Sequence, residues 1–128
     1  MAYLWIGIAG FFGAILRYSI GLFLFDESEM FPFATLTVNL IGSFLLSWFT
    51  TYFVKRFSIP DHLQAAIGTG FVGSFTTFST LSVETVTLIH NNDLFLAVVY
   101  VFISIAGGLI MSRLGYRAVK EKRTNEHA

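Results

Sequence analysis

The sequence of 128 residues contains little charge, two prolines and no cysteine. The absence of cysteine excludes disulfide bonds and thiolate metal sites. Charged residues make up 12% of the chain and hydrophobic residues 55%, whereas about 25% of a typical soluble domain is charged. With a mean hydropathy of +0.70, this composition indicates an integral membrane protein rather than a soluble domain.

Long apolar stretches account for most of the chain, and none of them contains lysine. A bilayer core about 30 Å thick is crossed by roughly 20 helical residues, and four stretches are long enough, at 4–25, 33–54, 63–89 and 94–116. The connectors between them contain Pro32, Pro60 and an Asn-Asn-Asp cluster, which favour turns. We therefore expect an all-α membrane protein with one four-span domain over residues 1–128 and a basic C-terminal tail at 117–128.

Basic residues are missing from one side of the expected membrane protein. If the four spans alternate in direction, the N-terminus, the second connector and the tail share one side, which carries Lys55, Arg56, Arg117, Lys120, Lys122 and Arg123. The opposite side carries Asp26, Glu27, Glu29 and Asp93 and no Lys or Arg. Lys/Arg bias in short loops sets orientation, so both termini are predicted to be cytoplasmic. We expect the basic tail to anchor this orientation near anionic lipid rather than to bind nucleic acid.

Hydroxyl and amide side chains form stripes along three of the four stretches, since residues four apart share a helix face. The stripes are Thr35, Asn39, Ser43 and Ser47; Thr76, Thr80 and Glu84; and Tyr100, Ser104, Gly108 and Ser112. The stretch 4–25 instead carries the small residues Ala9, Gly13 and Gly21 around Arg17. Small and hydroxyl-bearing residues join membrane helices, so the stripes predict helix packing, a polar pathway between helices, or both.

Arg17 and Glu84 are charged residues inside the apolar stretches, where charge is costly and often functional. Both lie toward the non-cytoplasmic ends of their stretches. One interpretation is therefore structural: an ion pair within one subunit, or two side chains that reach the interface. In the other, Arg17 draws an anion into a vestibule and Glu84 orients hydroxyl groups along a polar track. These residues by themselves leave both interpretations open.

The stretch 63–89 is longer than a bilayer requires, because as one helix it would extend roughly 40 Å. A break near 73–77 would shorten it, and Gly70, Gly73 and a run of hydroxyl residues permit one. Broken membrane helices expose carbonyl and amide groups to ions. Carbonyl oxygens suit a hard cation such as Na⁺, whereas amide and hydroxyl donors suit an anion, and the sequence of the break does not decide between them.

Three motifs together resemble the Fluc (CrcB-type) family of bacterial fluoride-specific channels: "GAILRY" at 13–18, "TLTVNLIGSF" at 35–44 and "TGFVGSFTTFSTLSVET" at 69–85. The similarity covers nearly all of the chain, and "TTFST" after the Gly-rich turn is its most specific part. The resemblance implies a passive channel in the bacterial plasma membrane that exports fluoride and lowers its cytoplasmic level. It also implies an antiparallel dimer with two pores and a third helix broken near its middle.

The resemblance assigns roles to particular residues. It implies a structural Na⁺, not transported, at the dimer centre on the backbone carbonyls of Gly73 and Thr76. Its pore residues fall on Asn39, Phe78, Ser79, Thr80, Ser82 and Tyr100, while Arg17 and Glu84 match its first-span arginine and third-span acidic residue. Hydroxyl and amide donors and the positive edges of aromatic rings can replace the water around fluoride. A deep site of fixed Lys or Arg would hold the ion too firmly, and the lack of Lys fits this.

Two features depart from the family pattern. Family members typically have a second Phe three residues after the first, but this position is Leu81. Members that insert in both orientations need balanced Lys and Arg, whereas the six-to-zero bias favours one orientation. We therefore favour a heterodimer with an oppositely oriented paralogue that supplies the missing ring. The alternative is a homodimer in which Leu81 is tolerated and enough copies insert in the opposite orientation.

Two other functions fit a small four-span protein. A small multidrug-type proton-coupled exporter uses a carboxylate in its first span, but here that span carries Arg17 and the embedded carboxylate is Glu84. A non-transporting membrane assembly subunit would use the polar stripes only to bind neighbouring helices. An enzyme is not expected, because His62, His90 and His127 are dispersed and no nucleophile–base–acid spacing is present.

Overall fold

The structure is a computed structural model that describes residues 1–25 and 30–126, with the backbone alone beyond Lys120. This part of the chain is helical and contains no strand. In chain order the elements are α1 (Ala2–Leu24), α2 (Phe33–Trp48), the π-helical turn η1 (Phe49–Phe53), α3 (Val54–Phe57), α4 (Asp61–Ala65), the π-helical turn η2 (Ala66–Val72), α5 (Gly73–Phe75), α6 (Phe78–His90) and α7 (Leu94–Glu126). Outside the described residues lie Asp26, Glu27, Glu29 and the side chains of Lys122 and Arg123.

Three helical stretches among the described residues are long and apolar enough to cross a membrane: Ala2–Leu24, Phe33–Phe57 and Leu94–Lys120. They agree with the predicted stretches at 4–25, 33–54 and 94–116 and confirm a helical membrane protein. The second combines α2, η1 and α3 without interruption. The stretch predicted at 63–89 comprises two helical runs, at 61–75 and 78–90. Each of these is shorter than the roughly 20 residues that a bilayer requires.

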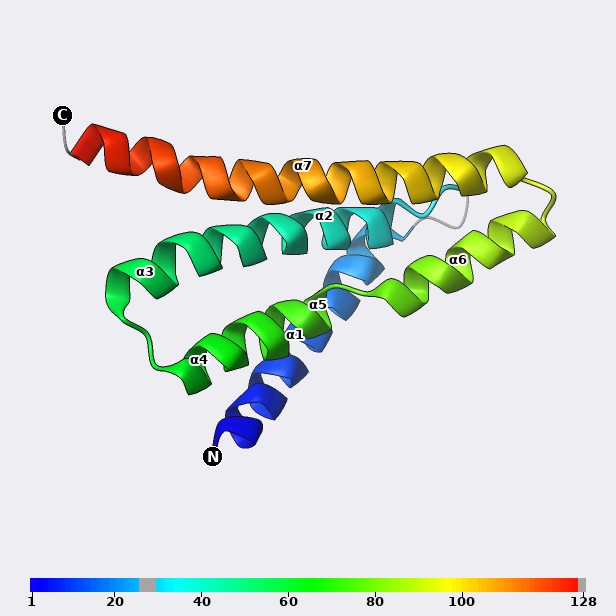
Figure 1. Ribbon diagram of the computed structural model, residues 1–128. Coiled ribbons are helices and arrows are strands. Elements are labelled where there is room, and N and C mark those ends of the chain that lie inside the picture. The colour runs from blue at the N-terminus through cyan, green and yellow to red at the C-terminus, as the bar shows by residue number, and fades with distance from the viewer. Residues whose placement is uncertain (26–29, 127–128) are drawn as a thin grey trace.

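Two pairs of helices form the body of the molecule (Figure 1). Helix α7 lies along α2, and α1 crosses beside the run formed by η2 and α5. Helix α6 diverges from that run and contacts α7 near the N-terminal end of α7. Helix α7 continues past residue 116, so the first part of the basic tail is helical.

Close contacts between these helices depend on glycine. A Cβ atom added at Gly13 of α1 would overlap the carbonyl oxygen of Phe71 in η2, and one added at Gly115 of α7 would lie 2.6 Å from the carbonyl oxygen of Phe44. A Cβ atom at Gly21 would meet no atom of another described element within 4 Å. The small-residue stripe of α1 therefore serves helix packing at Gly13, as small residues commonly do in membranes.

The buried core is small and most large apolar side chains point outward. Leu36, Leu88, Ala97 and Tyr100 form a buried cluster between α2, α6 and α7. Large side chains on the outer faces of α1 and α7, such as Phe95, which is 79% exposed, have no partner in this cluster. Extended apolar surface is unusual in a soluble monomer, and it fits helices surrounded by lipid and by other protein surfaces.

Candidate functional site

The helical path stops for two residues between α5 and α6. Thr76 has φ −80° and ψ 157°, and Thr77 has φ −147° and ψ 123°, so both are extended. An interruption leaves carbonyl groups before it and N–H groups after it without helical partners. Because buried backbone groups need hydrogen bonds, side chains from neighbouring elements have to supply them.

The side-chain amide of Asn39, on α2, pairs with both backbone groups of Thr77. Its Nδ2 donates to the Thr77 carbonyl oxygen at 2.9 Å, and its Oδ1 accepts from the Thr77 N–H at 2.7 Å. A carboxamide carries a donor and an acceptor side by side, so it bonds an extended residue much as a neighbouring strand would. The pairing also satisfies an amide that would be costly to bury alone.

The side chain of Thr77 begins the next helix. Its Oγ1 accepts from the Thr80 N–H at 3.2 Å, which is the bond of a helix N-cap. The same hydroxyl donates to Thr80 Oγ1 at 3.0 Å and lies 3.3 Å from Ser79 Oγ. Thr77 is 9% exposed, so these bonds form in a largely buried position.

The same rearrangement leaves two carbonyl groups without their usual helical donors. The Thr77 N–H, four residues after Gly73, donates to Asn39, and the Thr80 N–H, four residues after Thr76, donates to the Thr77 hydroxyl. The carbonyl groups of Gly73 and Thr76 are therefore released from the helical pattern at the interruption.

Helix α2 approaches the interruption closely because residue 42 is glycine. A Cβ atom at Gly42 would overlap Thr76 Cγ2 and lie 3.3 Å from Cδ1 of Phe75. Since Asn39 lies one helical turn before Gly42, the close approach brings the amide within hydrogen-bond reach of Thr77. The sequence "TVNLIG" thus supplies both the partner of the extended residues and the space for them.

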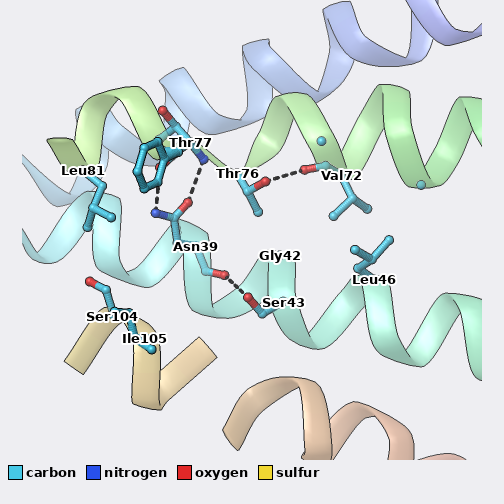
Figure 2. A pocket seen from close by; sticks show the side chains of 13 residues that line it. Asn39, Gly42, Ser43, Leu46, Val72, Thr76, Thr77, Leu81, Ser104 and Ile105 are labelled. Carbon is cyan, nitrogen blue, oxygen red and sulfur yellow. Dashed lines mark hydrogen bonds between the residues drawn. The ribbon is translucent and has the colours of Figure 1, made fainter. Parts of the chain in front are cut away.

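A groove of about 360 Å³ opens beside the interruption (Figure 2). Its lining residues are Asn39, Gly42, Ser43, Leu46, Gly68, Val72, Gly73, Thr76, Thr77, Phe78, Leu81, Ser104 and Ile105. Figure 2 shows Leu81 of α6 and Ser104 of α7 to the left of the Asn39 amide, with Leu81 above Ser104. The Ser104 hydroxyl is buried and has no hydrogen-bond partner within the described chain, whereas Ser43 donates to the Asn39 carbonyl of its own helix at 2.9 Å.

A second cavity, of about 390 Å³, also has Thr77 in its lining. Its lining includes Arg17, Thr35, Thr77, Thr80 and Glu84. The structure therefore brings the two predicted charged residues to one space. It forms no ion pair between them, although both side chains belong to its described part.

Both carboxylate oxygens of Glu84 accept hydrogen bonds from neighbouring helices. Thr35 Oγ1 of α2 donates to Oε1 at 2.8 Å, and the Tyr100 hydroxyl of α7 donates to Oε2 at 2.6 Å. Tyr100 is fully buried. The carboxylate therefore joins α2, α6 and α7, and both of these donors come from the predicted polar stripes.

The remaining predicted site residues lie in different surroundings. Phe78 lines the groove but is 79% exposed. Ser79 is exposed. The Ser82 hydroxyl donates to the Phe78 carbonyl of its own helix at 2.9 Å. Neither Ser79 nor Ser82 lines either of the two cavities. In this protomer the predicted pore residues thus divide between the groove, the second cavity and the surface of α6, while Tyr100 lies in the buried cluster.

Thr77 is the central residue that the sequence-based site missed. It is common to both cavities, pairs with Asn39 and caps α6. The signal available was a threonine three residues before Thr80 at the start of an apolar run, which is a helix-start pattern. This pattern does not single out Thr77 in the sequence, because the neighbouring Ser and Thr residues have equivalent chemistry.

The sequence profile of the family described as "CrcB-like protein, Camphor Resistance (CrcB)" matches residues 4–116. The chain belongs to the CrcB family. The matched CrcB region includes the interruption and every residue named above in the two cavities. The family resemblance seen in the sequence motifs is therefore confirmed.

Curated relatives extend the comparison within the CrcB family. The chain is 60% identical over 110 residues, 86% of its own length and 96% of the relative's, to "Fluoride-specific ion channel FluC 1" of Desulfitobacterium hafniense (strain Y51). It is 52% identical over 117 residues, 91% of its length and 85% of the relative's, to the protein of that name from Bacillus cereus (strain ATCC 10987 / NRS 248). It is 49% identical over 124 residues, 96% of both chains, to "Fluoride-specific ion channel FluC 2" of Geobacillus kaustophilus (strain HTA426).

Proposed function

We propose that this chain forms a passive, fluoride-specific channel of the bacterial plasma membrane that lets fluoride leave the cytoplasm. The observation that carries the proposal is 60% identity to a relative named as a fluoride-specific ion channel, over 110 residues that make up 96% of the relative's length. Transport rather than catalysis is the role of such a protein. The relatives' names also favour a channel over a proton-coupled exporter or a non-transporting assembly subunit.

The chemistry of the groove supports passage of a small anion. Fluoride is strongly hydrated, so a pore has to replace its water with close donors. The unpartnered Ser104 hydroxyl lines the same groove as the exposed ring of Phe78, and the positive edge of such a ring attracts anions. Thr77 also lines the Arg17 cavity, together with Thr35 and Thr80. The hydroxyl groups of Thr35 and Tyr100 donate to the Glu84 carboxylate at this cavity.

We propose that residues 61–90 form one membrane-spanning unit broken at Thr76 and Thr77, which makes four spans in all. The two runs, at 61–75 and 78–90, together have the length for a bilayer crossing. With four spans, Lys55, Arg56, Arg117 and Lys120 lie on one side, and the Lys/Arg bias places that side and both termini in the cytoplasm.

The groove is proposed to be completed by a second chain in an antiparallel dimer. Non-helical backbone at membrane depth is tolerated only where protein or water surrounds it. Gly73 at the interruption is exposed in the protomer, and so is the ring of Phe78. A partner surface would cover this backbone and form the other wall of each pore.

The donor set at the interruption fits the structural Na⁺ expected from the family. Within the described residues, no group of three His, Cys, Asp or Glu could hold a metal ion. A cation would instead use the carbonyl oxygens of Gly73 and Thr76, which have lost their helical donors. Oxygen ligands of this kind suit hard cations. Bound Na⁺ would supply a fixed positive charge beside the carbonyl oxygens of Gly73 and Thr76, and it would not itself be transported.

We favour a heterodimer with an oppositely oriented paralogue over a homodimer. Leu81 lines the groove and packs against the core cluster, and it has no aromatic edge to offer an anion. A partner with Phe at this position would give one pore both of its rings. The one-sided distribution of Lys and Arg independently favours a partner of opposite orientation.

Substituting Phe78 tests the channel function. Phe78→Ile keeps an apolar side chain but removes the ring. Fluoride efflux from liposomes, measured with a fluoride electrode, should fall by at least about tenfold. This is the effect of losing one favourable contact of about 1.4 kcal/mol. Phe95→Ile on α7 is the matched control, because Phe95 is also 79% exposed and does not line the groove. Unchanged fluoride efflux in an assembled Phe78→Ile protein would remove the pore assignment, and efflux of chloride at a similar rate would remove the selectivity.

A further inference from the structure

A small basic pocket lies far from the interruption, between α7 and the helix that ends in α3. Its volume is about 90 Å³, and its lining residues are Thr51, Lys55, Tyr116, Val119 and Lys120. Figure 1 shows α3 beneath the C-terminal part of α7. The pocket shares no lining residue with the groove or with the Arg17 cavity.

The two helices contribute matching chemistry to this pocket. Thr51 and Lys55 are four residues apart on one helix, and Tyr116 and Lys120 are four residues apart on the other. Residues at this spacing share a face, so each helix presents one hydroxyl and one ammonium group to the same space. Val119, which is 2% exposed, supplies the apolar part of the lining. Hydroxyl and ammonium donors around one small volume suit a tetrahedral oxyanion.

The Thr51 hydroxyl differs from its neighbours in having no hydrogen-bond partner in the described chain. Hydroxyl groups on membrane helices commonly donate to the carbonyl four residues earlier, and Thr50 does so, to Leu46 at 2.8 Å. Thr51 belongs to the π-helical turn η1, where the carbonyl positions differ from those of an α-helix. Its hydroxyl is therefore available to a ligand in the pocket.

The position of the pocket along the two helices corresponds to the membrane interface. Lys55 lies near the end of the apolar stretch Phe33–Phe57. Lys120 follows the apolar run predicted at 94–116 and lies in the basic C-terminal part of α7. Tyr52 and Tyr116 lie close by in sequence, and Trp and Tyr are enriched at this depth. The positive side of the protein faces the cytoplasmic leaflet, where anionic headgroups collect around basic residues.

We propose that this pocket binds the phosphate of an anionic phospholipid, with phosphatidylglycerol as the test ligand. The Lys55 and Lys120 ammonium groups offset the phosphate charge, and the Thr51 and Tyr116 hydroxyls donate to its oxygens. The phosphate lies between two like charges on facing helices and thereby joins α3 to α7. The acyl chains extend along the outward apolar faces of the same helices, which a soluble phosphate ion could not use. This site is independent of the proposed fluoride pathway.

Native mass spectrometry of the purified, delipidated protein with added phosphatidylglycerol tests the proposal. The pocket pair Lys55→Gln and Lys120→Gln should retain roughly tenfold less of this lipid, since both charge-assisted contacts to the phosphate are lost. The control pair Arg56→Gln and Arg117→Gln removes the same charge at exposed positions that do not line the pocket. The control pair should lose severalfold less retention than the pocket pair, because it loses only the general attraction of basic residues to an anionic headgroup and no contact to the phosphate in the pocket.

Two further measurements distinguish a specific lipid-phosphate site from general attraction of anions to a basic surface. Thr51→Val removes the hydroxyl without changing charge or shape, and should weaken retention severalfold while leaving the folded protein intact. Inorganic phosphate in millimolar excess should not displace the lipid. Equal losses in the pocket and control pairs, unchanged retention in Thr51→Val, or displacement by inorganic phosphate would each overturn the proposal. Phosphatidylcholine retained as well as phosphatidylglycerol would overturn it too.

Discussion

Asn39 and Thr77 are joined by two hydrogen bonds, one to each backbone group of Thr77, at 2.9 and 2.7 Å. This contact holds a residue in extended conformation between two helices. The two helices can therefore follow one another across the interruption with the backbone of Thr77 satisfied by a side chain from α2.

Replacing Asn39 with Ala removes both bonds at once. Each unpaired buried backbone group costs about 1–3 kcal/mol, so Asn39→Ala should lower the thermal unfolding temperature in detergent and abolish fluoride efflux. Ser43→Ala is the control, because the Ser43 hydroxyl bonds only to its own helix, and it should unfold near the unmodified temperature. An Asn39→Ala protein with unmodified stability and flux would contradict the role given to this contact.

Gly42 and Thr76 form a second pair whose contact can be tested by rescue. Gly42→Ala places a methyl group against Thr76 Cγ2, and overpacking of this kind costs about 1–3 kcal/mol. Thr76→Ser removes Cγ2 and keeps the hydroxyl. The double variant should therefore recover part of the thermal stability lost in Gly42→Ala.

The control for the rescue is Gly7→Ala, because a Cβ atom at Gly7 meets nothing within 4 Å and the unfolding temperature should not fall. If Thr76→Ser fails to improve Gly42→Ala in any measure of folding, the clash lies elsewhere in the fold.

The Glu84 carboxylate links Thr35 to Tyr100, and a double-mutant cycle measures this link. Tyr100→Phe and Thr35→Val each remove one donor, and interhelical hydrogen bonds in membranes contribute about 0.6 kcal/mol on average, with a maximum near roughly 1.7 kcal/mol. Each variant should therefore lose stability in this range. Because both donors act on one carboxylate, the double variant should lose more or less than the two single losses combined. Strictly additive losses in unfolding free energy would show that the two bonds act separately.

Leu81→Phe tests the preference for a heterodimer. The substitution introduces the aromatic ring typical of the family at a half-buried position that lines the groove. We expect the unmodified chain, reconstituted alone, to conduct fluoride more slowly than when combined with an oppositely oriented paralogue carrying Phe there. Leu81→Phe should increase the flux of the chain alone if missing rings limit it. Full flux from the unmodified chain alone, inserted in both orientations, would rule out the need for a partner.

The absence of cysteine allows the orientation to be measured directly. His62→Cys lies at the start of α4 and Asn91→Cys follows α6, and both positions are exposed. In intact cells a membrane-impermeant maleimide should label Asn91→Cys and leave His62→Cys unlabelled until the cells are permeabilised. Labelling of both positions in intact cells would indicate insertion in both orientations and would favour a homodimer.

The sequence by itself was sufficient for the membrane class, three of the apolar helices and the family. These properties depend on the length of apolar runs, the position of charges and short motifs, all of which are local. The charge distribution likewise predicts orientation without any contact between helices, since insertion responds to loop residues one by one.

Only the tertiary structure decided which hydroxyl groups form hydrogen bonds and which residues are their partners. The importance of Thr77 depends on Asn39, 38 residues earlier, and the position of Asn39 depends on Gly42 meeting Thr76. Likewise, Arg17 and Glu84 share a cavity without an ion pair in the described residues, and Thr35 and Tyr100 donate to the carboxylate instead. Neighbouring Ser and Thr residues have the same chemistry in the sequence, and their roles differ only because packing between helices brings a particular donor or acceptor within about 3 Å.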